Sequence, residues 1–212
     1  MAKTYKITRL PAGTIPSSID WNRIPAAVIS TYKWVHGYAP AAMAKMVYVE
    51  GECFVLHMVC GEERPRVTCH AYNEPVYKDS CMEFFAVWDA ASDRYVNMEM
   101  NAAGTLLSNI GSDRHERAPI LDVCGEIFPV ESEILSDAWT VTATVPLAMI
   151  AKLYGTDAES LASRLVSGYT FRGNFYKCGD ETKIPHFGMW NEVETATPDF
   201  HRPEFFGELV LQ

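Results

Sequence analysis

A strand pair with two chemically different faces is the feature of this sequence that most constrains its fold. Residues 79–101, DSCMEFFAVWDAASDRYVNMEMN, contain two runs of alternating side chains separated by the loop-like residues 89–93. Successive side chains of a β-strand point to opposite faces, so alternate positions belong to different surroundings. The even positions carry mainly apolar side chains: Met82, Phe84, Ala86, Trp88, Val96, Met98 and Met100. We therefore predict an antiparallel hairpin whose even face packs in a core.

The odd face of the same hairpin mixes aromatic bulk with carboxylates and amides. Its members are Glu83, Phe85, Val87, Tyr95, Asn97, Glu99 and Asn101. Pairing of Trp88 with Arg94 would close the hairpin, and in that register Glu83 lies directly opposite Glu99. Opposed like charges destabilise a strand pair, so we expect compensation by an arginine, a metal ion or the hydroxyls of a ligand.

Similar alternation and closely spaced turn signals elsewhere predict an all-β chain built as a sandwich or barrel. Further strands are predicted over residues 44–49, 53–60, 66–72, 139–145, 169–177 and 207–211. Thr156 and Glu159 have the spacing of a capping box, and the apolar residues after them predict one short helix. Residues 104–129 are rich in charge and turn residues and follow no period.

Composition restricts the classes of function. The 212 residues, 48% hydrophobic and 21% charged, are typical of a globular chain, and we expect one domain over residues 1–212. The formal net charge of -9, without a cluster of lysine and arginine, argues against nucleic acid as a partner. The apolar stretches are shorter than the roughly 20 residues of a membrane span, so no membrane partner is expected.

The first residues, MAKTYKITRLPAG, lack the apolar run of a secretory signal. We expect a cytoplasmic location for the chain as given, and an extracellular or periplasmic one if a leader has been removed. The six cysteines form no CxxC pair and lie mainly in apolar segments, so we interpret them as reduced core residues.

Several segments together resemble the family 9 carbohydrate-binding modules and the broader family-9-like bacterial domains. They are WNRIP at 21–25, DSCMEFF at 79–85, residues 95–101 with Gly104, RGNFY at 172–176 and PDFHRPEFFG at 198–207. The resemblance implies a two-sheet antiparallel β-sandwich of jelly-roll-like topology with one or two short helices. It also implies non-catalytic binding of a carbohydrate and a link to polysaccharide catabolism.

The resemblance assigns sugar contacts to three residues by their motifs: Glu83, Asn101 and Asn174. In the family two tryptophans sandwich the end of a glycan, and calcium ions support the fold. Here Trp190 lies in the corresponding late loop, and Tyr77 replaces the second tryptophan. Glu99 stands where the sugar-binding modules place an arginine.

A pyranose ring packs its C–H face on an aromatic ring and hydrogen-bonds carboxylate, amide and guanidinium groups through its hydroxyls. These requirements define the predicted ligand-binding set: Tyr77, Glu83, Asn97, Glu99, Asn101, Arg172, Asn174, Tyr176 and Trp190. The same residues are open to a structural interpretation, with Arg172 paired to one of the glutamates and Tyr77 and Trp190 packed at the rim of the fold.

Other functions remain as alternatives. A glycoside hydrolase needs two carboxylates, which Glu83 and Glu99 would supply, but no cleft or nucleophile motif supports catalysis, and we expect no enzyme activity. A module that has lost its sugar and acts as a structural or protein-interaction domain is the second alternative. Calcium is an expected cofactor candidate from the resemblance alone. The sequence lacks the ligand spacing of a zinc site, because Cys69 and His70 form an isolated pair. Haem is not expected either, because the methionines fit the core.

Overall fold

The computed structural model describes residues 2–212 as a mainly β chain whose fourteen strands are joined in one curled sheet. The strands are β1 (Thr4–Leu10), β2 (Ala27–Ile29), β3 (Thr31–Tyr32), β4 (Ala41–Val49), β5 (Cys53–Gly61), β6 (Cys81–Val87), β7 (Tyr95–Asn101), β8 (Leu106–Gly111), β9 (Arg117–Pro119), β10 (Val130–Ile134), β11 (Trp139–Pro146), β12 (Thr170–Cys178), β13 (Phe187–Met189) and β14 (Gly207–Leu211). The hydrogen-bonded order is β10-β11-β5-β4-β1-β14-β12-β6-β7-β8-β9.

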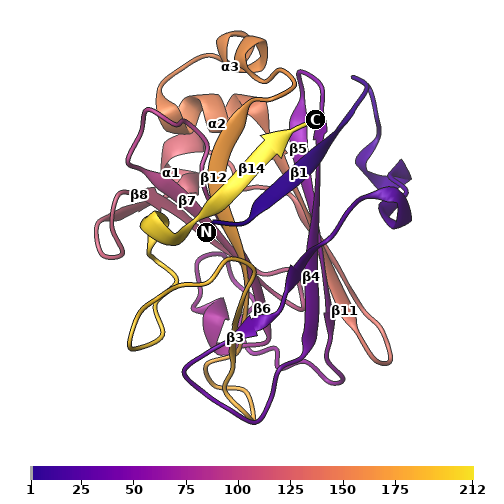
Figure 1. Ribbon diagram of the computed structural model, residues 1–212, viewed down its shortest axis with the longest axis vertical. Coiled ribbons are helices and arrows are strands. Elements are labelled where there is room, and N and C mark those ends of the chain that lie inside the picture. The colour runs from indigo at the N-terminus through magenta and orange to yellow at the C-terminus, as the bar shows by residue number, and fades with distance from the viewer. Residues whose placement is uncertain (1) are drawn as a thin grey trace.

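Strand β1 joins the two halves of this sheet. Its residues Thr4 to Ile7 pair in parallel with β14, and its residues Thr8 to Leu10 pair in parallel with β4. Figure 1 shows β1 and β14 side by side across the front of the molecule. The hydrogen-bonded path is therefore continuous, and the division into two separate sheets that the resemblance implies is not confirmed.

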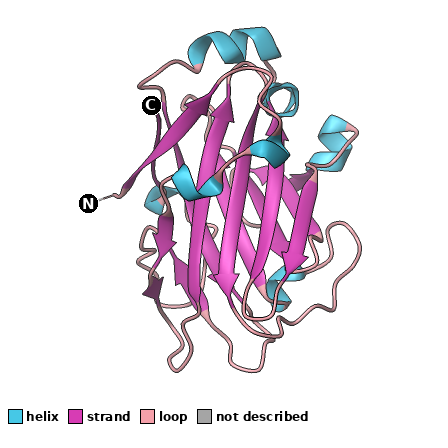
Figure 2. Ribbon diagram, turned by 90° about the vertical axis from the view of Figure 1, so that its right-hand side faces the viewer, coloured by secondary structure: helices cyan, strands magenta, loops and turns pink. Residues whose placement is uncertain are grey.

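The two halves share one hydrophobic core. Rings from both halves form a continuous contact chain in which Phe54 of β5 lies 4.8 Å from Tyr48 of β4 and 4.8 Å from Trp88, and Trp88 stacks on Phe171 of β12 at 4.8 Å between ring centroids. Figure 2 looks onto the half that holds β4, β5 and β11, and these long strands lie side by side there. Burial of these apolar side chains between the halves is the main force that holds the curled sheet together.

Most of the predicted strands are confirmed. The hairpin of β6 and β7 has the predicted register, with Glu83 opposite Glu99 and the even positions in the core. Strands β4, β5, β11, β12 and β14 lie within two or three residues of their predicted bounds. The prediction of a strand over residues 66–72 is wrong. There the Asp79 carboxylate accepts hydrogen bonds from the backbone amides of Thr68 and Cys69, which a strand partner would otherwise use.

Three α-helices lie together at one end of the sheet: α1 (Ile120–Cys124), α2 (Leu147–Tyr154) and α3 (Ala158–Arg164) (Figure 1). Helix α3 is the predicted one, although its N-cap is Asp157, whose side chain accepts from the Ser160 amide, rather than Thr156. Helix α2 was not predicted; it begins directly after Pro146 and ends at Gly155, which has a left-handed φ of 69°. Among residues 2–212, no helix has the length and hydrophobicity needed to span a membrane.

The segment 104–129, which no pattern defined, contains β8, β9 and α1. Strand β8 extends the hairpin by pairing with β7, and β9 pairs with β8 at the edge of the sheet. All six cysteines are buried with free thiols, as predicted. The extension by β8 and β9 widens the polar face of the hairpin and supplies one side of the site described next.

Candidate functional site

The odd face of β6 and β7 is the floor of a pocket. Two neighbouring rows of side chains, each contributed by β12, β6, β7 and β8 in turn, cross this floor. The first row is Tyr176, Glu83, Glu99 and Leu107, and the second row is Asn174, Phe85, Asn97 and Asn109. Period-two alternation on four adjacent strands thus brings the carboxyl and amide groups together on one face.

We use the name site pocket for the hollow of about 270 Å³ above this floor. Its floor contributes Glu83, Asn97, Glu99, Leu107, Asn109 and Cys178. Three aromatic side chains stand around it: Tyr77 of the short 3-10 helix Val76–Lys78, Phe187 of β13 and Phe200 of the loop before β14. Charged and polar groups complete the rim: Arg114, Arg117, Asp180, Asp199 and His201, together with Pro198.

The two glutamates of the floor are buried and their pKa values are raised. Glu83 is 3% exposed and Glu99 is 4% exposed. Burial raises the pKa of Glu99 to about 7, against a hydrogen bond from Asn97 and the charge of Arg117, which lower it. Burial, with Cys178 and Glu99 nearby, raises the pKa of Glu83 well above its ordinary value. Protonation therefore relieves the repulsion between the two opposed carboxylates that the strand register would otherwise create.

Arg117 of β9 organises the amide beside the glutamates. Its guanidinium donates two hydrogen bonds to Asn97 Oδ1, at 3.1 and 2.8 Å, and others to backbone carbonyls, including that of Tyr95 at 2.9 Å. The Asn97 amide nitrogen in turn donates to Glu99 Oε1 at 2.9 Å. Arg117 thus fixes the orientation of Asn97, and Asn97 fixes one oxygen of Glu99.

His201 and Phe200 form one wall of the site pocket. The His201 Nδ1 atom is hydrogen-bonded to the Tyr95 hydroxyl at 2.9 Å, and its Nε2 atom lies 4.0 Å from Glu99 Oε1. Burial, with Arg117 and Arg114 nearby, lowers the pKa of His201 to about 3, so its ring is neutral near pH 7. Phe200 stacks on Tyr176 with 4.1 Å between ring centroids. The wall is therefore held rigidly against the floor.

Four of the nine predicted ligand-binding residues line the site pocket: Tyr77, Glu83, Asn97 and Glu99. Tyr176 lies directly beneath the wall, fully buried, and donates a hydrogen bond from its hydroxyl to the Phe200 carbonyl at 3.3 Å. The structure gives Tyr176 the role of a support for Phe200 and not that of a surface for a ligand.

Two of the predicted asparagines, Asn174 of β12 and Asn101 of β7, anchor loops. Asn174 exchanges hydrogen bonds with the backbone of Asn191, donating to its carbonyl at 2.8 Å and accepting from its amide at 2.9 Å. Asn101 donates to the Cys69 carbonyl and to Asp79, and accepts from two backbone amides of the following turn. Both side chains are fully buried and already engaged, and neither lines the site pocket.

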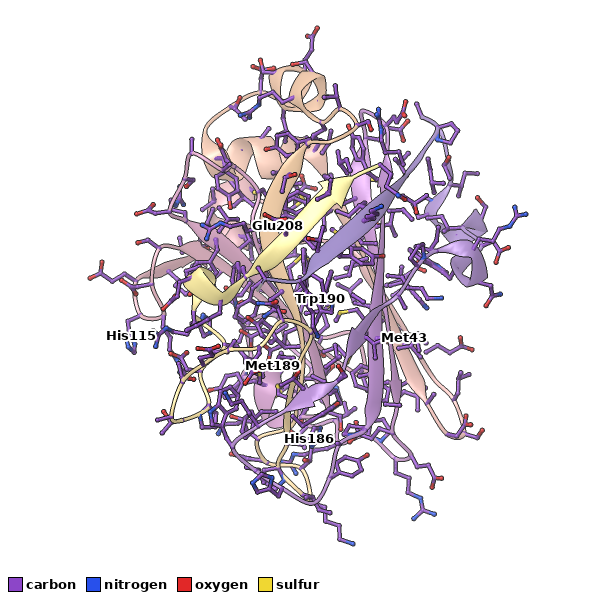
Figure 3. The ribbon with its side chains drawn as sticks, in the orientation of Figure 1. Met43, His115, His186, Met189, Trp190 and Glu208 are labelled. Atoms are coloured by element: carbon purple, nitrogen blue, oxygen red, sulfur yellow. The ribbon has the colours of Figure 1, made fainter. Side chains whose placement is uncertain are left out.

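Arg172 and Trp190 also lie outside the site pocket. Arg172 is exposed and donates to the Pro203 carbonyl at 3.2 Å, so the expected ion pair with a floor glutamate does not form. Trp190 is only 5% exposed and packs edge-on against Tyr5 and Phe175 in the main core. Figure 3 labels Trp190 near the centre of the molecule, close to β1. The prediction of an open stacking surface at Trp190 is therefore corrected, because this ring lies on the core side of the sheet.

Sequence reasoning missed the residues that surround the floor. Arg114, Arg117 and Asn109 belong to the segment without a pattern, and Cys178 was assigned to the core. Phe200 and His201 lie in the segment PDFHRPEFFG, which was singled out as part of the resemblance but given no role. That motif was the one available signal for the wall.

Potential metal ligands occur at one corner of the floor. Within residues 2–212, one group of histidine, cysteine or acidic side chains has ligand atoms within 4.8 Å of one another, namely Cys81, Glu83 and Cys178. Two thiols and a carboxylate suit zinc better than calcium, which prefers six to eight oxygens. Burial raises the pKa of Cys81 to about 12 and that of Cys178 well above its ordinary value. Both thiols are thus protonated near pH 7, and Cys178 donates its S–H to Glu83 Oε1 at 2.9 Å.

Comparison with known proteins identifies relatives over almost the whole chain. The family model described as carbohydrate-binding family 9 matches residues 13–211. A protein from Bacteroides uniformis ATCC 8492, provisionally assigned as carbohydrate-binding, is 26% identical with a TM-score of 0.81, and the alignment covers 100% of both chains. None of the curated proteins compared matches the chain.

Two solved structures of a family 9 carbohydrate-binding module from Caldicellulosiruptor kristjanssonii have the same fold. The complex with cellotriose has 12% identity and a TM-score of 0.67, over 99% of this chain and 94% of the module. The complex with glucose has 13% identity and a TM-score of 0.66, over 99% of this chain and 96% of the module.

Proposed function

The chain belongs to carbohydrate-binding family 9, and from this premise we propose that it binds carbohydrate in the site pocket. One observation carries the proposal: a single hollow of about 270 Å³ combines carboxyl and amide groups on its floor with aromatic rings around its sides. A sugar ring offers the matching surfaces, hydroxyls for the polar groups and C–H faces for the rings.

The size of the site pocket favours a small ligand unit. Pockets for drug-sized ligands typically enclose about 300–1,000 Å³, so a hollow of about 270 Å³ suits about one sugar ring. The related module from Caldicellulosiruptor kristjanssonii was solved with glucose and with cellotriose, which supports a ligand of this kind. The proposed ligand is therefore a monosaccharide or one terminal unit of a longer glycan.

Accessibility of the site pocket favours ligand binding over a purely structural role. Tyr77 is 38% exposed at the rim, which leaves its ring available to a ligand. The segment 104–129 contributes Leu107, Asn109, Arg114 and Arg117 to the lining, and the hollow is partly open to solvent. A domain that had lost its ligand would be expected to fill or cover this face.

The arrangement of the glutamates supports binding without catalysis. A glycoside hydrolase places two carboxyl groups on either side of the scissile bond. Glu83 and Glu99 are instead cross-strand neighbours on one floor and project from the same face of the sheet. A non-catalytic module of this kind would serve polysaccharide catabolism by holding a glycan for a separate enzyme. Hydrolysis of a glycoside by the purified chain would contradict this part of the proposal.

Isothermal titration calorimetry with glucose, xylose and cellotriose tests the proposed function. We expect saturable binding that weakens at least about tenfold in Glu83→Gln and in Phe200→Ala. Arg172→Ala is the matched control, because Arg172 was a sequence candidate that the structure places outside the site pocket. Titrations with added calcium and with a chelator test whether calcium supports the fold, as the resemblance to the family implies. The absence of saturable binding to any sugar by a folded protein would overturn the proposal.

A further inference from the structure

Acidic groups outnumber basic groups around the site pocket. The lining contains four carboxyl side chains, Glu83, Glu99, Asp180 and Asp199, and two arginines, Arg114 and Arg117. Without a cationic partner the floor carboxyls avoid mutual repulsion by keeping protons, as their raised pKa values indicate. The question for the ligand is therefore whether either arginine forms an ion pair with Glu83 or Glu99, or whether a ligand must supply the positive charge.

Both arginines are engaged elsewhere. Arg114 forms an ion pair with Asp199 at 3.3 Å at the rim. Arg117 donates to Asn97 and to the carbonyls of Tyr95, Asn109, Gly111 and Asp113, and its guanidinium lies 4.0 Å from the centroid of the Tyr95 ring. Its charge acts on Glu99 from a distance, but no ion pair joins it to either floor glutamate.

Histidine and cysteine do not supply the missing positive charge. His201 Nε2 lies 4.0 Å from Glu99 Oε1, and its ring is neutral near pH 7 because burial lowers its pKa. Cys178 beside Glu83 is a protonated thiol for the corresponding reason. Within residues 2–212, no cationic side chain therefore neutralises Glu83 or Glu99.

Each floor glutamate has one oxygen free to receive a ligand. Glu83 Oε1 accepts from the Cys178 thiol, and Glu99 Oε1 accepts from the Asn97 amide. Among the described residues 2–212, neither Oε2 atom has a hydrogen-bond donor, although both side chains are more than nine-tenths buried and line the site pocket. Both Oε2 atoms are open to the site pocket rather than sealed in the interior, so a ligand in the site pocket can donate hydrogen bonds to them.

We propose that the ligand carries a primary ammonium group, as a sugar with an unacetylated amine does, and that this group lies between Glu83 and Glu99. This inference rests on the proposed function and adds the chemical class of the sugar. An ammonium carries its donors on one compact charge, which matches the two carboxyl oxygens that have no donor in the protein. The rings of Tyr77 and Phe200 provide faces that attract a cation.

A hard metal ion fits the same place less well. Calcium is held by six to eight oxygens, whereas the immediate neighbours of the two carboxyls are the Cys178 thiol, the Asn97 amide nitrogen and a neutral imidazole. An ammonium has three donors, and the two carboxyl oxygens without donors can accept two of them.

The test compares sugars that differ only in the group at C2, which is a hydroxyl, an amine or an acetamide. Calorimetric titrations in the presence of a chelator use three trios: glucosamine, galactosamine and mannosamine, each with its neutral parent sugar and its N-acetyl form. We expect at least one amine to bind about tenfold or more tightly than both other members of its trio. Proton release, measured by repeating the titration in buffers of different ionisation enthalpy, is expected for the amine because a cation favours the ionised carboxyls.

Two variants assign the effect to the floor glutamates. In Glu99→Gln and in Glu83→Gln the ratio of amine affinity to parent affinity is expected to fall towards one, whatever the affinity for the parent sugar becomes. Glu133→Gln, on the exposed face of β10, is the control and keeps the ratio. Parent sugars that bind as tightly as their amines would overturn the inference and leave the proposed function intact. An unchanged ratio in both floor variants would overturn the assignment to these carboxyls. Failure of all nine sugars to bind the folded protein would overturn the inference together with the proposed function.

Discussion

Glu83 and Glu99 face each other across β6 and β7 as buried cross-strand partners, and within residues 2–212 neither forms an ion pair with a lysine or an arginine. Their pKa values are raised in the folded chain, that of Glu99 to about 7. In the unfolded chain a glutamate has its ordinary pKa near 4.5. The folded chain therefore binds more protons than the unfolded chain in the interval between these values.

The first prediction is a decrease in stability with rising pH. The contribution of Glu99 is fully present below the unfolded pKa and is lost as the pH rises through about 7, which amounts to on the order of 2 kcal/mol between pH 5 and pH 8. Glu99→Gln keeps the acceptor for Asn97 and removes the titration, so its free energy of unfolding should exceed that of the wild type at pH 8 and approach it at pH 5. Urea denaturation at four pH values measures this. An identical pH slope in Glu99→Gln and in the exposed control Glu133→Gln would contradict it.

The register of this pair could be predicted from the sequence because period-two alternation and a short loop define a hairpin locally. The role of the buried amides could not be predicted from the sequence. Asn97 and Asn101 occupy the same face of β7, yet Asn97 lies in the site pocket and Asn101 holds a turn, because their partners come from segments far away in the sequence. Arg117 was missed for the same reason: its acceptors are backbone carbonyls that no sequence pattern encodes.

Trp190 illustrates a second limit of sequence reasoning. It follows the short strand β13, and its amide donates to the Phe175 carbonyl, which places the ring on the core side of the sheet. A late loop with a tryptophan resembles a stacking surface in sequence, but a displacement of one residue in a strand moves a side chain to the opposite face. The wall of the site pocket is formed instead by Phe200, ten residues later in the chain.

The second prediction separates these two aromatic residues. Trp190→Ala removes a buried ring that contacts Tyr5 and Phe175, and should lower the free energy of unfolding by about 3–5 kcal/mol. Tyr77→Ala removes a ring that is 38% exposed, and should change stability by less than about 1 kcal/mol while it weakens sugar binding several-fold. Thermal denaturation and calorimetry of both variants measure the contrast. A Trp190→Ala protein that is as stable as the wild type but does not bind sugar would contradict this prediction and indicate that Trp190 contacts the ligand.

The third prediction concerns the order in which the thiols react. Three cysteines are 7–8% exposed: Cys53, Cys69 and Cys124. The other three are at most 1% exposed: Cys60, Cys81 and Cys178. The thiolate is the reactive form, and burial raises the pKa of all six thiols, most strongly in the second group. The first group should therefore be alkylated earlier in the native protein. Peptide mapping by mass spectrometry after brief alkylation gives the order, and complete labelling in denaturant is the control. Early labelling of Cys178 would show that the pocket floor holds a thiolate.

A buried ion pair on the opposite face of β12 gives the fourth prediction. The Lys177 ammonium is fully buried and lies 3.3 Å from the Glu62 carboxylate, which also accepts from Trp139 Nε1 at 3.2 Å. The ammonium further donates to the Cys178 carbonyl and contacts His186 Nε2, each at 2.7 Å. Burial and the nearby lysine lower the pKa of His186 to about 4, so its ring is neutral and able to accept this hydrogen bond.

Glu62→Leu leaves the Lys177 charge in the interior without its counter-charge, and we expect it to lower the free energy of unfolding by about 3–5 kcal/mol. Lys177→Met alone should destabilise by a similar amount, because it leaves the carboxylate buried. The double variant should be destabilised by clearly less than the sum of the two, since it removes both charges together. Glu192→Ala is the control, because its partner Lys33 at 2.8 Å is partly exposed and an exposed pair contributes less than about 1 kcal/mol. Additive losses in the double variant, measured by urea denaturation, would show that Lys177 and Glu62 are stabilised independently by their other hydrogen bonds.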